Sequence, residues 1–87
     1  MKDSKMYSVE LSKKAEEQHS KLPKEIRLRI INVLERIRIR PHSFVKRLIG
    51  SPYYRLRIGD YRLILDIQND KLIIYVVEIG HRKNIYK

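Results

Sequence analysis

A two-residue turn at Gly59-Asp60 separates two runs in which large apolar side chains alternate with polar, mostly basic ones. These runs span residues 54–58 and 61–67, and alternation with a period of two is typical of strands that bury one face. Gly-Asp between such runs predicts a tight β-hairpin. A two-residue loop places Arg57 directly opposite Arg62, so one face of the hairpin is apolar and the other is basic. The predicted apolar face consists of Tyr54, Leu56, Ile58, Tyr61, Leu63 and Leu65.

The first half of the chain has mainly helical periodicity. After a short predicted strand at 7–11, Ser12 is a good N-cap for a helix that continues to about residue 20. Pro23 suits the first turn of a second helix, and Pro41 is expected to end that helix near Arg40. The apolar stripe of the second helix consists of Ile26, Ile30, Val33, Leu34 and Ile37.

Two further strands are expected in the second half. Residues 45–49 form a short extended run, and residues 72–79 are apolar at nearly every position. The second pattern predicts a strand that is covered on both faces and that ends at Gly80. Residues 1–87 are therefore expected to form one α+β domain of order β-α-α-β-β-β-β. In this fold a two-helix hairpin packs on one face of a twisted, mainly antiparallel sheet, which the first strand joins through the helical crossover.

The charge of the chain points to its partners. Twenty Lys and Arg residues oppose ten Asp and Glu residues, which gives a net charge of +10. Such an imbalance in a short chain indicates a polyanionic partner: RNA, DNA, the ribosome, anionic lipid or an acidic protein. Solubility alone is the alternative reason for the charge. No apolar stretch approaches the roughly 20 residues of a membrane span, and no signal peptide is evident, so a cytoplasmic protein is expected.

The basic face of the predicted hairpin holds Arg55, Arg57 and Arg62. Two cations directly opposite each other destabilise a strand pair by about a few tenths of a kcal/mol. A bound anion would offset that cost, because arginine forks match phosphate oxygens two at a time. The alternative is a solvated sheet face that is basic without binding anything.

Basic and aromatic residues also follow the last predicted strand. Arg82, Lys83 and Tyr86 can reach a face of the sheet, and a tyrosine among cations is typical of RNA-binding surfaces. The chain has no cysteine, which excludes a thiolate nucleophile, and its three histidines lack the spacing of a metal site. We therefore expect neither a metal nor a cofactor.

The second predicted helix carries apolar residues away from its core stripe. Leu28 and Ile39 fall roughly opposite the stripe, and Ile31 lies beside it. Scattered apolar residues on a surface are common and need no function. A contact for a partner helix is the other interpretation, and it is slightly favoured here.

Three stretches follow each other behind the two predicted helices: Tyr53-Tyr54-Arg55-Leu56-Arg57, then Gly59-Asp60-Tyr61-Arg62-Leu63, then Ile79-Gly80-His81-Arg82-Lys83 with Tyr86. On these stretches the chain resembles the RelE/ParE toxin superfamily, and within it the RelE messenger-RNA interferases of bacteria and archaea. The similarity extends over essentially the whole chain. It implies a compact sheet with helices on one side. It also implies a toxin that cleaves messenger RNA in the ribosomal A site, inhibits translation, and is neutralised by an acidic RelB-type antitoxin.

The resemblance further implies a metal-independent reaction. The ribose 2′-hydroxyl attacks the adjacent phosphate, so the enzyme has to accept a proton, protonate the leaving 5′-oxygen and neutralise the growing negative charge. By position, Arg62 corresponds to the phosphate-binding arginine of the family, and Arg82 and Tyr86 correspond to its C-terminal arginine and tyrosine. The residues assigned to RNA binding are Arg55, Arg57, Lys83 and His81.

The chain departs from the family pattern in one respect. Members known for this chemistry carry lysine at the positions of Arg55 and Arg57. Lysine can lose a proton when its pKa is lowered, whereas arginine remains charged, so this pair is not suited to act as general base. Tyr86 becomes the candidate base, and His81 is the reserve.

Two other functions are compatible with the same patterns. A ParE-type gyrase inhibitor shares the fold and some of the sequence, but it acts through a protein contact and needs neither the clustered arginines nor Tyr86. A non-enzymatic nucleic-acid-binding module would use the arginines for binding alone. The basic face and the tail tyrosine favour the ribonuclease.

Overall fold

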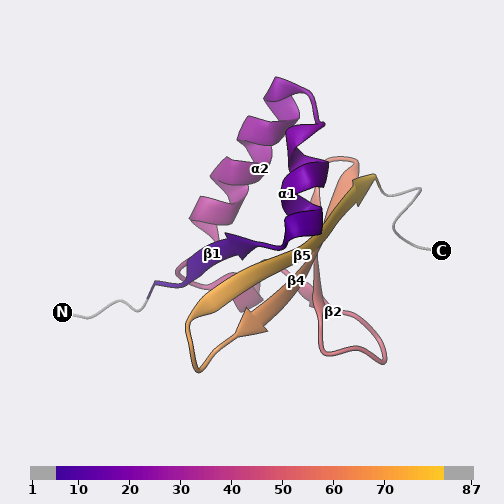
Figure 1. Ribbon diagram of the computed structural model, residues 1–87. Helices are drawn as coiled ribbons and strands as arrows, with labels where there is room; N and C mark the ends of the chain where they lie inside the picture. Colours follow the sequence, from indigo (N-terminus) through magenta and orange to yellow (C-terminus); the bar gives the residue numbers. More distant parts are fainter. Residues whose placement is uncertain (1–5, 82–87) are drawn as a thin grey trace.

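The chain forms two layers, a helical layer over one face of a sheet (Figure 1). The computed structural model describes residues 6–81. Neither helix in this range is long and apolar enough to cross a membrane. The elements are β1 (Ser8–Leu11), α1 (Lys13–Ser20), α2 (Lys24–Arg36), a 3₁₀ turn (Pro41–Ser43), β2 (Lys46–Arg47), β3 (Tyr54–Ile58), β4 (Tyr61–Gln68) and β5 (Ile73–His81).

The sheet has five strands in the order β1-β5-β4-β3-β2. β1 lies parallel to β5, whereas all other neighbours are antiparallel. The helical hairpin of α1 and α2 connects β1 to the rest of the sheet. The predicted α+β class, the order of the elements and the entry of the first strand into the same sheet are confirmed.

The β3–β4 hairpin has the register that its turn predicts. Ile58 pairs with Tyr61, and Arg57 pairs with Arg62. Gly59 has a φ of 59°, and Asp60 does not share this positive φ. A positive φ at the first turn position alone is the pattern of a type II′ turn, whose twist matches that of the strands.

A β-bulge in β5 corrects the register of the core. Ile64 pairs with Glu78 and Leu65 pairs with Val76, so Val77 is an extra residue on β5. Without the bulge, Val76 and Ile79 would point to opposite faces, because they are three residues apart. With the bulge, both of these side chains are buried on the face that the helices cover.

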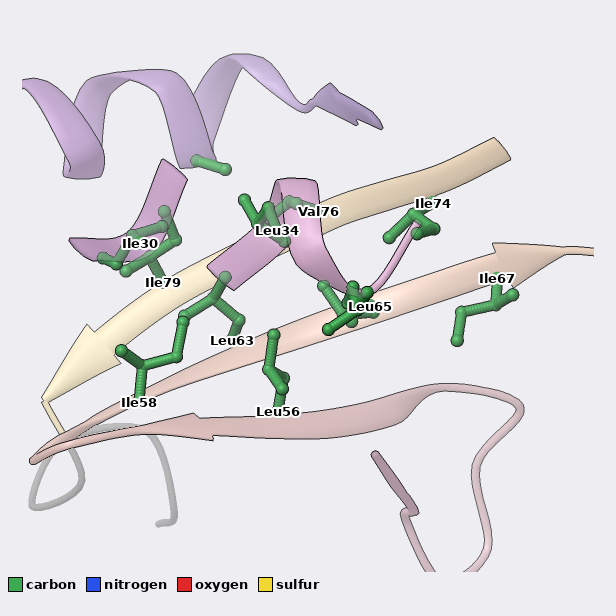
Figure 2. Close-up of a cluster of buried hydrophobic side chains, with 12 residues drawn as sticks. Ile30, Leu34, Leu56, Ile58, Leu63, Leu65, Ile67, Ile74, Val76 and Ile79 are labelled. Atoms are coloured by element: carbon green, nitrogen blue, oxygen red, sulfur yellow. The ribbon is translucent and has the colours of Figure 1, made fainter. Parts of the chain in front are cut away.

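The core between helices and sheet is apolar throughout, and no polar side chain in residues 6–81 is fully buried. Figure 2 shows side chains from α2, β3, β4 and β5 pointing into this layer. The predicted stripe of α2 is confirmed, since Ile30, Leu34 and Ile37 are buried and Ile26 and Val33 pack against them. The buried cluster consists of Ala15, Ile30, Leu34, Ile37, Leu56, Ile58, Leu63, Leu65, Ile67, Ile74, Val76 and Ile79.

α1 lies along the part of β5 that β1 does not reach. The N-cap residue Ser12 accepts a hydrogen bond from the backbone N–H of Ala15 (3.0 Å) and donates one to the carbonyl of Val77 (2.8 Å). Farther along, the Gln18 Oε1 accepts a hydrogen bond from the backbone N–H of Ile79 (2.6 Å). α1 therefore satisfies backbone groups on β5 that would otherwise need another strand.

The predicted end of α2 is wrong. α2 ends at Arg36 rather than near Arg40, and Pro41 begins the 3₁₀ turn instead. The reason is a tertiary contact: the backbone N–H of Tyr7 donates to the carbonyl of Arg38 (2.9 Å), and the Arg38 Nε donates to the carbonyl of Tyr7 (2.7 Å). These bonds hold the turn that follows α2 beside the start of β1.

The last strand also differs from its prediction in two ways. β5 continues through Gly80 to His81, where it still pairs with β4. Its outward residues, including Tyr75 and Glu78, are only half-buried, so the strand is covered on one face and not on both. Its position between β1 and β4 confirms that it is an interior strand of the sheet.

Ser12→Ala is expected to lower the free energy of unfolding by about 1–2 kcal/mol, because it removes both the N-cap and the bond to β5. Denaturant unfolding followed by circular dichroism measures the change. Ser20→Ala is the matched control, since the Ser20 hydroxyl donates to the carbonyl of Glu17 within its own helix, at an exposed position. Equal effects of the two exchanges would contradict the role given to Ser12.

Candidate functional site

The candidate site lies on the sheet face that points away from the helices, which we call the outer face. On this face Arg57 of β3 stands directly opposite Arg62 of β4. The Arg57 side chain is exposed, whereas Arg62 is half-buried and its Nε is fully buried. The sequence-predicted meeting of these two cations is therefore present, and it brings two positive charges together at the hairpin end of the sheet.

A second row of residues crosses the same face one pleat farther along. Lys46 of β2 pairs with Arg55 of β3, and Arg55 pairs with Ile64 of β4. Lys46 is exposed, Arg55 is half-buried, and Ile64 is buried although it points away from the core. Lys46 was not among the residues selected from the sequence, and it adds a third cation beside Arg55 and Arg57.

Two pockets open over these rows and share Lys46 and Arg55. The smaller has a volume of about 250 Å³ and the larger about 520 Å³. Phe44, Lys46, Arg55 and Arg57 line the smaller pocket. The larger pocket is lined by Lys46, Arg47, Leu48, Ile49, Ser51, Arg55 and Ile64. Among the described residues, neither lining contains a carboxylate, so both pockets are suited to an anionic ligand.

Two carboxylates elsewhere in the sheet have partners of their own. Glu78 of β5 forms an ion pair with Lys14 (3.4 Å), and Asp66 of β4 accepts a hydrogen bond from the side chain of Gln68 (3.1 Å). The ion pair draws Glu78 toward α1. Positive charge is thus concentrated over β2, β3 and the start of β4.

The remaining sequence-predicted site residues are not on this part of the face. His81 pairs with Tyr61, and the two rings meet edge to face at 5.4 Å and 77°. Since Tyr61 alternates with Arg62, this contact puts the His81 ring on the side of the sheet opposite to Arg62. Arg82, Lys83 and Tyr86 lie outside the described residues.

The apolar residues predicted to contact a partner are exposed. Leu28 and Ile31 lie on the surface of α2, and Ile39 follows the end of that helix. Sequence reasoning had separated all three from the core stripe, and their exposure agrees with that separation. They lie outside both pockets.

Phe44, Lys46 and Ile49 are among the pocket residues that sequence reasoning missed. Phe44 ends the 3₁₀ turn with a helical backbone conformation, and it lines the smaller pocket together with Lys46. No periodic spacing in the sequence indicates this contact, and the stretch could not be aligned with β3. The loop between β2 and β3 spans residues 48–53. A loop of this length does not define the register of the two strands from the sequence, whereas a two-residue loop does.

Comparison with known proteins places the chain in a family. The sequence model described as "ParE toxin of type II toxin-antitoxin system, parDE" matches residues 9–86. No curated protein sequence gives a significant match. Among solved structures, the toxin–antitoxin complex RelBE2 from Mycobacterium tuberculosis has a TM-score of 0.81 at 21% identity, covering 97% of this chain and 100% of that one. At this identity the likeness shows the fold.

Two archaeal structures are somewhat closer in sequence. The RelE–RelB complex from Pyrococcus horikoshii OT3 has a TM-score of 0.77 at 26% identity and covers 91% of this chain and 98% of that one. The RelB–RelE complex from Methanococcus jannaschii has a TM-score of 0.68 at 27% identity and covers 88% and 94%. The resemblance to RelE toxins is therefore confirmed, and the family model spans nearly the whole chain. The chain belongs to the ParE/RelE family of toxins from type II toxin–antitoxin systems.

Proposed function

We propose that this toxin is a RelE-type endoribonuclease that cleaves messenger RNA in the ribosomal A site without a metal. The observation that carries the proposal is the pairing of Arg57 with Arg62 on an exposed sheet face, next to Lys46 and Arg55. Folding gains nothing from this arrangement, because like charges repel across strands. A phosphate bound between the guanidinium groups offsets the repulsion, so the arrangement is suited to binding phosphate.

The proposed reaction begins with attack of the ribose 2′-hydroxyl on the adjacent phosphorus and ends with loss of the 5′-oxygen. Negative charge grows on the phosphate oxygens, and Arg62 stabilises it from a position fixed by the sheet. Its buried Nε limits the movement of the guanidinium, which favours a preorganised contact. Arg82, assigned by the family resemblance, is the second stabilising group.

The general base is assigned by elimination. Arginine does not act as a proton acceptor in proteins, so Arg55 and Arg57 are not assigned the role of accepting the proton of the 2′-hydroxyl. Tyr86 takes this role in the proposal, by its correspondence to the C-terminal tyrosine of the family. His81 is the reserve, although its contact with Tyr61 holds its ring on the far side of the sheet from Arg62. Lys83 contributes to RNA binding.

A RelB-type antitoxin is the proposed partner in the cell. The similar toxins from Pyrococcus horikoshii and Methanococcus jannaschii were solved in complex with RelB. The net charge of +10 suits an acidic partner, and the exposed apolar residues of α2 and its C-terminal extension offer it a contact surface. That surface consists of Leu28, Ile31 and Ile39. Because the proposed substrate is messenger RNA on the ribosome, the proposed site of action is the cytoplasm.

A ParE-type gyrase inhibitor is the second candidate, because the family model carries the description of a ParE toxin. Such a protein would act through a contact with gyrase and would have no use for opposed arginines. A module that binds nucleic acid without cleaving it is the third candidate. Both alternatives predict that messenger RNA stays intact.

Induced expression is expected to arrest growth and to leave messenger RNA cut within translated regions, because the A site presents only these regions to the enzyme. Primer extension on RNA from the induced cells maps the cuts. Intact transcripts accompanied by DNA breaks would refute the ribonuclease hypothesis and favour the gyrase inhibitor. Intact transcripts without DNA breaks would favour the binding module.

Arg62→Ala and Arg82→Ala are each expected to lower the rate of cleavage on programmed ribosomes by about 100-fold, because each removes a charge that stabilises the transition state. Both exchanges are also expected to restore growth on induction. Arg36→Ala is the control, since Arg36 is an exposed arginine in the last turn of α2 and lies outside both pockets. If both variants are as toxic as the parent, the site has been placed on the wrong residues.

A further inference from the structure

The two pockets of the outer face are separated by one shared wall of positive charge. Lys46 and Arg55, which are paired neighbours on β2 and β3, line both of them. Each pocket also has one apolar group of its own that is open to solvent. Phe44 provides it in the smaller pocket, and Ile49 provides it in the larger. Along the surface, an apolar side chain is therefore followed by the cationic pair and then by a second apolar side chain.

We propose that these pockets hold two successive bases of single-stranded RNA, one against Phe44 and one against Ile49, with the intervening phosphate on Lys46 and Arg55. The inference rests on the proposed function, because it takes RNA as the ligand. It adds two base-contacting residues and a phosphate contact to the site. It also defines the register in which the strand crosses β2 and β3.

Phe44 has the properties of a base-stacking residue. Its side chain is 50% exposed, although a phenyl ring gains more from burial than most side chains. Phe44 ends the 3₁₀ turn, and its side chain lines the smaller pocket together with Lys46, Arg55 and Arg57 of the outer face. Bases stack on such rings with little dependence on sequence, because every base has a π-face.

Ile49 has the properties of an apolar wedge. It is fully exposed, beside Gly50, in the loop that extends from the sheet between β2 and β3 (Figure 1). Apolar side chains at such positions are inserted between bases in other nucleic-acid complexes. The larger pocket continues the apolar surface through Leu48 to Ile64, which is buried. A base that enters the larger pocket is removed from water and contacts apolar side chains.

The charge of the shared wall comes from residues that point toward the pockets. Arg47 also lines the larger pocket, but its guanidinium carbon lies 5.9 Å from the centroid of Tyr54, on the other face of the strand. Lys46 and Arg55 are thus the cations at the wall, and Arg57 stands beside the smaller pocket. Arg57 also connects the wall with Arg62, where the proposed cleavage takes place.

An acidic protein would satisfy the charge of the wall but not its pattern. A nucleic acid strand presents phosphate and base in alternation, and the surface presents cation and apolar group in the same alternation. The pockets are also continuous with the arginine pair. For these two reasons the observations favour RNA over an acidic peptide.

The test measures the affinity of the full chain for a fluorescent 2′-O-methyl hexaribonucleotide, which lacks the nucleophile and stays intact. A hexamer of the same charge but without bases serves as the reference ligand. Phe44→Ala and Ile49→Ala are each expected to weaken binding of the first ligand about tenfold, since each exchange removes one base contact. Neither exchange is expected to change the affinity for the abasic hexamer.

Met6→Ala is the matched control, because Met6 is an exposed apolar residue outside both pockets, and it is expected to bind the hexamer as the parent does. Thermal unfolding checks the fold of each variant. Phe44→Leu, which keeps an apolar side chain of similar reach but removes the ring, is expected to weaken binding less than Phe44→Ala.

Three results would overturn the proposal. The first is a parent that binds the normal and abasic hexamers equally well, or binds neither. The second is an affinity of both alanine variants that equals the affinity of the parent, which would favour an acidic protein as the ligand of the pockets. The third is an equal loss of affinity for the two hexamers. Cleavage on programmed ribosomes is measured separately, so base-dependent binding without cleavage would refute the ribonuclease and not the subsite.

Discussion

The turn at Gly59 determines where the charges of this protein meet. Its positive φ permits a two-residue connection, and the short connection leaves one register for β3 and β4. In that register every large apolar side chain of the hairpin except Ile64 faces the helices. The same register forces Arg57 against Arg62 on the outer face. A shift by one residue would bury the arginines, so the burial of the core maintains the opposed charges.

Most of the fold could be predicted because its signals are local. The period of two in 54–58 and 61–67, the cap at Ser12 and the stripe of α2 all lie within short windows of sequence. The end of α2 could not be predicted in this way, because it depends on bonds between Arg38 and Tyr7, which are 31 residues apart. The bulge at Val77 was hidden for a similar reason, since an unbroken apolar run gives no sign of which residue is extra.

The candidate site divides along the same line. The pairing of Arg57 with Arg62 follows from the turn between them and was visible in the sequence. Lys46 and Phe44 reach the site through a loop of six residues, 48–53, whose length defines no register. The aromatic contact of His81 depends on the pairing of β4 with β5 across another turn. Family resemblance supplied roles for Arg82 and Tyr86, but it pointed to none of the residues in the loop.

α1 has a consequence beyond the stability of β5. A strand with an open edge can pair with a strand from another molecule, and proteins commonly protect such edges against aggregation. Here Ser12 and Gln18 occupy the open backbone of β5 beyond the end of β1. The two strands that remain at the margins, β1 and β2, have only four and two residues. Edge strands this short disfavour extension of the sheet by strand pairing, and the outer face is the broad surface left for recognition.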